Sequence, residues 1–348
     1  MQHQTGRTCS PRILRCVQLF ARDAARRTRL QGLGISLGLI TACGGKAAPE
    51  KSPALAAPPA APPARVFERT LHALNVNGTR LAFSVIGDSG ATPVVFVHGT
   101  LADYRSWRGQ DNLFAQSYRV LVYSRRFHRP NPQLADSSQT YSPKLHAEDL
   151  AGLLLTLNLA PAHVVGSSYG AYTALALARE HPELVRSLVL AEPLILPLLT
   201  GSEAGDAERR AFYTYALDPS RRAFARGDSV AGVRAFFDGT NGRGRFDRLP
   251  AAARAELLAH AFELRLEMLA NREQYFPPIS CAELGRVTKP VLLVRGASSP
   301  RVFQLINDEL ARCLQSDTTA TIPAAGHPPH TGNPAYYSLV VLRYLASH

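Results

Sequence analysis

Residues 162–172, AHVVGSSYGAY, carry the strongest structural signal in this chain. The apolar start of the segment predicts a short buried strand, and the alanine- and leucine-rich stretch Ala171–Glu180 predicts a helix. Between them, Gly166-Ser167-Ser168-Tyr169-Gly170 has the pattern G-x-S-x-G, which is typical of a tight strand-to-helix turn that presents a nucleophile. The glycine spacing selects Ser168 over the neighbouring Ser167, and the N-terminus of the helix favours negative charge that develops there.

Short apolar strands alternate with helical segments on both sides of this turn, which predicts an α/β fold with a mostly parallel sheet covered on both faces. An Asn77-Gly78 turn joins the first two strands as a hairpin. The other predicted strands are Pro93–Val97, Arg119–Tyr123, Val185–Leu190, Val291–Arg295 and Thr319–Ile322. The other predicted helices are Pro143–Leu159, Val302–Cys313 and Pro334–Leu345.

The block 196–280 interrupts this alternation. It has apolar residues at helical spacing and no strand pattern, so we expect a helical cap inserted into the fold. The folded core would then consist of residues 66–195 and 281–348.

Three motifs in order resemble the α/β-hydrolase superfamily: His98-Gly99-Thr100 after a predicted strand, the Ser168 turn, and Ala325-Gly326-His327 before the last helix. The resemblance covers about residues 66–348 and implies a sheet of about eight strands with helices on both faces. It implies that the backbone N–H groups of Thr100 and Tyr169 form an oxyanion hole. It also implies that His327 is the general base, with His330 as the alternative.

The acid of the expected triad departs from the commoner pattern of this superfamily. The usual position, three residues past Gly296, is occupied by Ser299, which cannot stabilise an imidazolium by charge. The other position used in the superfamily follows the strand after the nucleophile helix, and there the chain has Glu192. We therefore expect Glu192 to orient His327; a structural role for Glu192 stays open, with Asp308 and Asp317 as fallback acids.

Arg125 follows a predicted strand near the expected site. Its guanidinium could bind a substrate carboxylate, but an ion pair with Asp149 or Glu148 is the favoured interpretation.

The resemblance implies a serine hydrolase that cleaves an ester, thioester or lactone through an acyl-enzyme on Ser168, without cofactor or metal. Its substrate is expected to be a small molecule with an apolar acyl group. Two alternatives stay open. The first is a catalytically inactive, tethered binding protein, which the serine at 299 suggests. The second is an acyltransferase, carbon–carbon bond hydrolase or perhydrolase with the same triad.

Composition excludes several other classes of protein. The 348 residues are 46% hydrophobic and 19% charged, which suffices for a core and argues against general disorder. The formal net charge is +12, but half of it lies in the first 30 residues and the remainder is spread thinly. Nucleic-acid binding is therefore not expected.

The N-terminal segment has the order of a bacterial export signal. An arginine-rich start, a short apolar stretch and Thr41-Ala42-Cys43 follow one another. The last residues resemble a lipobox, which implies a signal peptide over 1–42 and a lipid anchor on Cys43 in a membrane facing the periplasm. Gly44 favours the outer membrane, and the Pro/Ala-rich stretch 43–65 is expected to be a linker. An amphipathic helix on a cytoplasmic protein is the alternative.

Two cysteines, Cys281 and Cys313, belong to the folded part. They could pair in an oxidising periplasm or remain two buried free thiols. Their spacing resembles no metal site.

Overall fold

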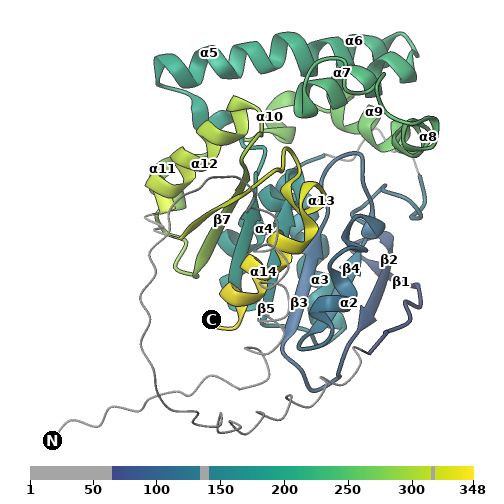
Figure 1. Cartoon of the computed structure of the whole chain (residues 1–348), viewed down its shortest axis with the longest axis vertical. Helices are drawn as coiled ribbons and strands as arrows, with labels where there is room; N and C mark the ends of the chain where they lie inside the picture. Colours follow the sequence, from purple (N-terminus) through teal and green to yellow (C-terminus); the bar gives the residue numbers. More distant parts are fainter. Residues whose placement is uncertain (1–64, 134–140, 315–317) are drawn as a thin grey trace, which may run out of the picture. The chain divides into compact units, whose positions relative to one another are not determined.

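The computed structural model describes residues 65–133, 141–314 and 318–348, and its centre is an eight-stranded sheet (Figure 1). The strand order is β1-β2-β4-β3-β5-β6-β7-β8. β1 and β2 form an antiparallel hairpin, β2 pairs antiparallel with β4, and all other pairs are parallel. The strands are β1 (His72–Val76), β2 (Thr79–Ile86), β3 (Pro93–Val97), β4 (Arg119–Tyr123), β5 (Ala162–Ser167), β6 (Val185–Ala191), β7 (Val291–Gly296) and β8 (Thr319–Ile322).

The central strand β3 is apolar along its whole length because both faces of the sheet are covered. In β3, Val95 and Val97 belong to one core cluster, and Val94 and Phe96 belong to the other. This split follows from the alternation of side chains along a strand. The predicted sheet and its coverage on both faces are confirmed.

Helices α3, α4 and α12 contribute to the first core cluster, and α2 and α14 contribute to the second. Helix α4 begins at Tyr169, two residues earlier than the alanine-rich pattern predicts, because Ser168 already turns the chain into the helix. The helices of the core are α2 (Asp111–Phe114), α3 (Pro143–Thr156), α4 (Tyr169–Glu180), α11 (Cys281–Leu284), α12 (Arg301–Leu314), α13 (Pro329–Gly332) and α14 (Pro334–Leu345). Cys281 and Cys313 form a disulfide that joins α11 to α12.

A group of helices from the segment between β6 and β7 lies over one end of the sheet (Figure 1). Two tyrosines attach this group to the core, since the hydroxyls of Tyr169 and Tyr172 donate to the carbonyls of Tyr275 and Pro277. The helices are α5 (Glu203–Phe212), α6 (Asp218–Ala225), α7 (Ser229–Asn241), α8 (Ala251–Leu258), α9 (Ala261–Leu269) and α10 (Arg272–Tyr275).

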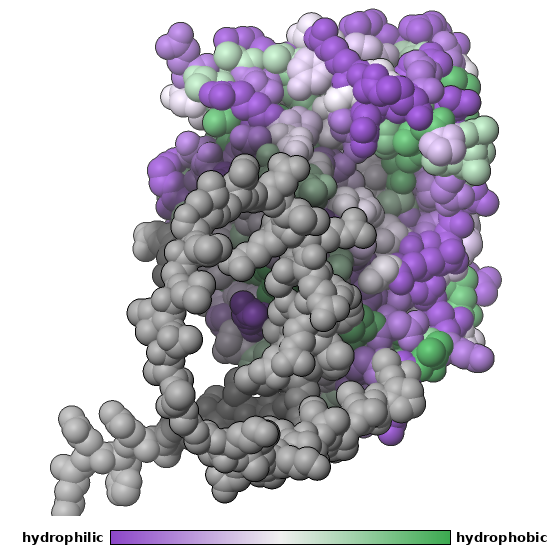
Figure 2. Space-filling model, viewed as in Figure 1, coloured by the Kyte–Doolittle hydropathy of each residue, from purple (hydrophilic) through white to green (hydrophobic). Residues whose placement is uncertain are grey.

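The visible face of the described residues is mainly hydrophilic (Figure 2). Within the described ranges, no helix has the length and apolar character required to cross a bilayer. The expected signal peptide 1–42, the lipid anchor at Cys43 and all of the linker except Arg65 lie outside the described residues.

Candidate active site

Ser168 lies in the sharp turn between β5 and α4, with φ 54° and ψ −124°. This left-handed backbone conformation is rare for a residue with a side chain and typical of strained functional turns. The flanking glycines are required because the turn leaves no room for a Cβ atom. A Cβ on Gly166 would lie 2.6 Å from Ala171 Cα, and one on Gly170 would lie 2.2 Å from the carbonyl oxygen of Val97.

The turn brings Ser168 to His327 and Glu192, which are 159 and 24 residues away in the sequence. His327 Nε2 lies 3.2 Å from Ser168 Oγ, and His327 Nδ1 lies 2.8 Å from Glu192 Oε2. All three side chains are nearly shielded from solvent. The arrangement has the geometry of a nucleophile, a general base and an acid that orients the base.

Glu192 directly follows β6 and has a positive φ of 48°. Its side chain is fully buried, and its second oxygen, Oε1, accepts a hydrogen bond of 2.7 Å from the backbone N–H of Gly296. Both carboxylate oxygens of Glu192 are therefore fixed by hydrogen bonds, one to His327 and one to the backbone of Gly296. Ser299 is buried, and its hydroxyl has no hydrogen-bond partner among the described residues. Of the fallback acids, Asp308 is exposed and pairs with Arg295, and Asp317 lies outside the described residues.

The plane of the His327 imidazole is fixed by stacking on Phe303, with 3.8 Å between the ring centroids. The alternative base, His330, is instead stacked on Trp107 at 4.1 Å, and neither of its ring nitrogens has a partner in the described part of the chain. Burial, with a further contribution from His327, lowers the pKa of His330 to about 3. Of the two histidines, it is therefore His327 that lies within hydrogen-bond distance of Ser168.

The expected oxyanion donors, Thr100 and Tyr169, lie on the two backbone segments that flank Ser168. The loop after β3 approaches the nucleophile closely, since a Cβ on Gly99 would lie 2.9 Å from Ser168 Cβ. Tyr169 is the first residue of α4, so its N–H has no acceptor within the helix. The N–H of Thr100 has no acceptor among the described residues. Both donors can therefore serve a bound oxyanion.

The interpretation of Arg125 as a partner of Asp149 or Glu148 is wrong. Asp149 pairs with the next residue, Arg126, and Glu148 pairs with His181. Arg125 is buried and faces Glu267 of α9 at 3.4 Å. The sequence offers no signal for this contact, because Glu267 comes from a helix whose register against the core follows from packing alone.

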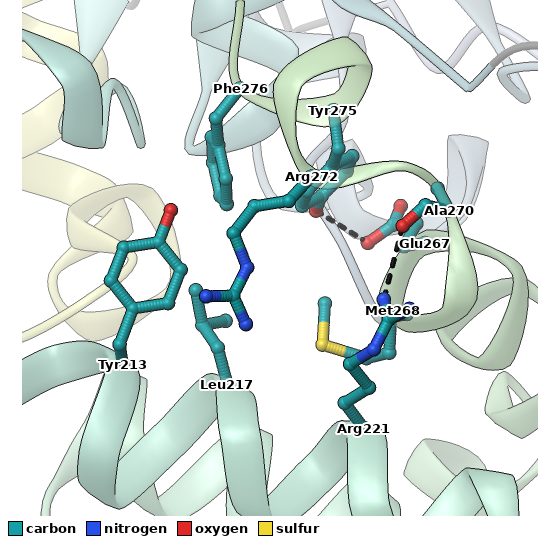
Figure 3. A pocket seen from close by; sticks show the side chains of 9 residues that line it. All are labelled: Tyr213, Leu217, Arg221, Glu267, Met268, Ala270, Arg272, Tyr275 and Phe276. Atoms are coloured by element: carbon teal, nitrogen blue, oxygen red, sulfur yellow. Dashed lines mark hydrogen bonds between the residues drawn. The ribbon is translucent and has the colours of Figure 1, made fainter.

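Glu267 and Tyr275 also border a cavity of about 20 Å³ between the helical segment 213–225 and the α9–α10 segment (Figure 3). The hydroxyl of Tyr275 donates to Glu267 Oε2 at 2.9 Å. On its other side, the Tyr275 ring stacks on Tyr169 at 4.6 Å. The cavity is lined by Tyr213, Leu217, Arg221, Glu267, Met268, Ala270, Arg272, Tyr275 and Phe276.

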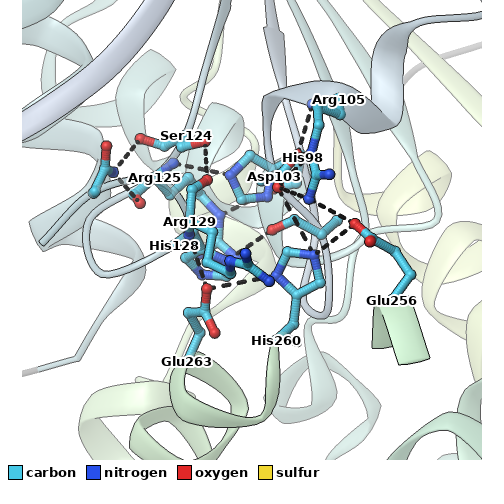
Figure 4. Close-up of polar contacts among 12 residues, drawn as sticks. His98, Asp103, Arg105, Ser124, Arg125, His128, Arg129, Glu256, His260 and Glu263 are labelled. Atoms are coloured by element: carbon cyan, nitrogen blue, oxygen red, sulfur yellow. Dashed lines mark hydrogen bonds and ion pairs between the residues drawn. The ribbon is translucent and has the colours of Figure 1, made fainter. Parts of the chain in front are cut away.

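A second polar cluster joins the same helices to the core near His98 (Figure 4). Asp103, Glu256 and His260 gather potential metal-ligand atoms within 4.8 Å of one another. The guanidinium of Arg105 lies 2.6 Å from each of the two carboxylates. Arg105 therefore already supplies the positive charge that a cation would bring to these residues.

Comparison with known proteins places this geometry in a family. Residues 92–334 match the family described as alpha/beta hydrolase fold, and this chain belongs to that family. In sequence it is similar to the uncharacterized hydrolase YraK of Bacillus subtilis, with 35% identity over 137 residues. This match covers 39% of the chain and only 49% of the relative.

Longer alignments agree with this assignment. The chain is 27% identical to the sn-1-specific diacylglycerol lipase ABHD11 of Mus musculus, over 75% of this chain and 83% of that protein. Its fold is similar to that of the carboxylesterase CesB from Bacillus subtilis, with a TM-score of 0.63 and 18% identity over 81% of this chain and 93% of the other. The two sequence relatives described above carry the names of a hydrolase and a lipase, which supports an enzyme.

Proposed function

We propose that this protein is a serine hydrolase that cleaves a carboxylic ester, thioester or lactone of a small molecule through an acyl-enzyme on Ser168. The observation that supports it best is the continuous hydrogen-bonded chain from Ser168 Oγ through His327 to Glu192. A serine hydroxyl is a weak nucleophile at neutral pH and needs a base within hydrogen-bond reach. Here the base is within reach and is held by a buried carboxylate.

In the proposed reaction, Ser168 Oγ attacks the substrate carbonyl carbon while His327 Nε2 takes the hydroxyl proton. The N–H groups of Thr100 and Tyr169 stabilise the resulting oxyanion. His327 then gives the proton to the leaving oxygen or sulfur, which departs and leaves the acyl group on Ser168. Water attacks the carbonyl carbon of this acyl-enzyme while His327 takes a proton from the water. His327 then returns this proton to Ser168 Oγ as the bond between Oγ and the acyl carbon breaks, which releases the acid and restores Ser168.

Labelling with a fluorophosphonate and hydrolysis of short p-nitrophenyl esters test the proposal. Wild-type protein should be labelled and active, and Ser168→Ala should lose labelling and at least about 10³-fold in kcat. Ser167→Ala is the matched control, because it removes the neighbouring buried hydroxyl, which has no hydrogen-bond partner among the described residues. Labelling that persists in Ser168→Ala would refute the assignment of the nucleophile.

The same experiment separates the alternatives. A folded wild-type protein that binds no probe and hydrolyses no ester would favour an inactive binding protein. A protein that is labelled at Ser168 but transfers its acyl group to an added alcohol or peroxide faster than to water would favour an acyltransferase or a perhydrolase. A protein that is labelled but acts only on carbon–carbon bonds would favour a carbon–carbon bond hydrolase with this triad.

We also propose that the protein is exported and anchored by lipid on Cys43, facing the periplasm. The lipobox-like sequence before Cys43 motivates this proposal. The disulfide between Cys281 and Cys313 supports it, since disulfides persist in oxidising compartments. Metabolic labelling with palmitate should mark the wild-type protein and not Cys43→Ser. Absence of label on the wild-type protein would remove the lipid anchor from the proposal.

A further inference from the structure

The peptide unit between Gly99 and Thr100 is held from its carbonyl side. Gly99 O accepts a hydrogen bond of 2.8 Å from His98 Nδ1 and another of 3.1 Å from Arg125 Nη2. The backbone N–H of Arg125 donates to His98 Nε2 at 2.9 Å, which leaves the ring proton of His98 on Nδ1. Burial, together with the nearby His128 and Arg125, lowers the pKa of His98 well below its usual value. His98 is therefore a neutral donor to Gly99 O.

This carbonyl belongs to the same planar unit as the Thr100 N–H that the proposed reaction uses. Because a peptide is planar and trans, fixing the direction of its C=O also fixes the direction of its N–H. A positive charge on the oxygen side further polarises the unit, which makes the N–H a stronger donor. A guanidinium at Gly99 O thus acts on the oxyanion hole without touching the substrate.

Arg125 contacts both halves of the oxyanion hole. Its side chain is fully buried, and its Nε donates to the carbonyl of His98 at 3.0 Å (Figure 4). Its guanidinium carbon also lies over the ring of Tyr169, 5.1 Å from the centroid. Arg125 therefore contacts the carbonyl of the peptide that supplies the Thr100 N–H, and also the ring of Tyr169, the residue that supplies the other N–H.

The counter-charge of this cation comes from outside the core, from Glu267 on α9. Glu267 Oε1 accepts from Tyr141 Oη at 2.8 Å and faces Arg125 Nη2, and Oε2 accepts from Tyr275 Oη (Figure 3). Burial and the nearby Glu267 raise the pKa of Tyr275 well above its usual value, so the phenol keeps the proton that it donates. The carboxylate is thus hydrogen-bonded on both oxygens, as a buried charge requires.

We infer that Arg125 and Glu267 form a positioning pair for the oxyanion hole. Arg125 orients and polarises the Gly99–Thr100 peptide and braces Tyr169, and Glu267 holds Arg125 in place when α9 is seated on the core. The helices between β6 and β7 then take part in catalysis through α9, because Glu267 supports the residue that positions the oxyanion hole. This inference rests on the proposed function, since it assigns a role in the same reaction.

A pair of double variants tests the inference with full-length protein. Arg125→Met/Glu267→Gln removes the buried pair next to the oxyanion hole. Arg126→Met/Asp149→Asn removes the adjacent buried pair, whose side chains lie 2.6 Å apart. Removing both charges in each case avoids leaving an unpaired buried ion. Active-site titration with a fluorophosphonate normalises every rate to the folded, labelled enzyme.

We expect the first double variant to lose about 10- to 100-fold in kcat with little change in KM, because an oxyanion interaction is strongest in the transition state. Its affinity for a trifluoromethyl ketone, which forms an oxyanion on the enzyme, should fall by a similar factor. Arg125→Lys, which keeps the buried positive charge, should restore part of the loss. The Arg126→Met/Asp149→Asn control should keep kcat and the affinity for the ketone within about threefold of wild type.

Equal losses in both double variants, or a loss confined to KM, would overturn the inference and leave only a structural role for Arg125. Failure of the proposed function would look different. In that case, Ser168→Ala would retain activity, or the wild-type protein would show none.

Discussion

At the scale of single residues, the proposed role of Glu192 as the acid of the triad leads to a prediction. Glu192→Gln removes the charge that supports a protonated His327 and should lower kcat by about 10²- to 10⁴-fold. Ser299→Asp in that background should recover at least tenfold. A Cβ on Gly296 would lie 2.7 Å from Ser299 Oγ, so the side chain of residue 299 is close to Gly296. The N–H of Gly296 donates to Glu192, so a carboxylate at position 299 would lie in the same region as Glu192. Steady-state kinetics on a p-nitrophenyl ester measures both effects.

Ser299→Asp alone is the informative control. It places a second carboxylate in the same buried region as Glu192, and like charges there disfavour ionisation. Activity and stability should both fall relative to the double variant. A Glu192→Gln protein with wild-type kcat would show that Glu192 is only a structural residue.

The sequence identifies those site residues that lie in local motifs and misses those that meet through packing. Ser168 and His327 occur beside glycines in recognisable turns, and Glu192 follows from the missing carboxylate at 299. Arg125 stands in no motif, and its partner lies 142 residues away on α9. The contact exists because the loop after β4 meets α9 in the folded protein, and nothing in either local sequence encodes that meeting.

At the scale of elements, the strand-to-helix turn depends on glycine. Gly170→Ala should destabilise the protein by several kcal/mol, about 2 to 4, because the new Cβ would lie 2.2 Å from backbone oxygen that cannot move aside. Gly109→Ala is the matched control, since the nearest atom to its Cβ would be Pro334 Cβ at 3.6 Å. Urea unfolding followed by circular dichroism measures the difference. Similar stabilities for the two variants would mean that the turn relaxes to accept a side chain.

The disulfide between α11 and α12 makes a second prediction at this scale. Cys281 and Cys313 are 32 residues apart, and chain entropy assigns such a loop about 3 to 4 kcal/mol of stability. The Cys281→Ser/Cys313→Ser variant should therefore unfold at a lower urea concentration. Dithiothreitol should shift the wild-type protein in the same direction and leave the variant unchanged. A reductant effect on the variant as large as on wild type would contradict this assignment.

At the scale of the whole molecule, alternation and periodicity predict the sheet well because strands buried on both faces have an unmistakable apolar pattern. For the segment between β6 and β7 they predict helices, but not where those helices lie on the core. Helices such as α8, which has no buried residue, carry little apolar patterning to fix their positions. The position of these helices on the core depends on contacts such as the stacking of the Tyr275 ring on the Tyr169 ring, which joins residues far apart in the sequence.

The buried histidines of the folded chain predict how its stability depends on pH. Burial lowers the pKa of His163 to about 4, helped by the positive charge of Arg186, and burial lowers that of His330 to about 3. In the unfolded chain these imidazoles titrate near pH 6.5. Below about pH 6.5 the unfolded state therefore binds protons that the folded state excludes, so stability falls as the pH falls. Each imidazole contributes a slope of up to about 1.4 kcal/mol per pH unit.

His330→Phe tests this directly, because phenylalanine keeps a ring against Trp107 and removes two buried nitrogens that lack partners in the described structure. The free energy of unfolding, measured in urea between pH 7 and 3, should decline less steeply in this variant, by up to about 1.4 kcal/mol per pH unit below 6. His163→Asn should flatten the same curve but cease to differ in slope below about pH 4, where the folded protein also binds the proton. Parallel curves for wild type and His330→Phe would show that the imidazole takes up its proton inside the folded core.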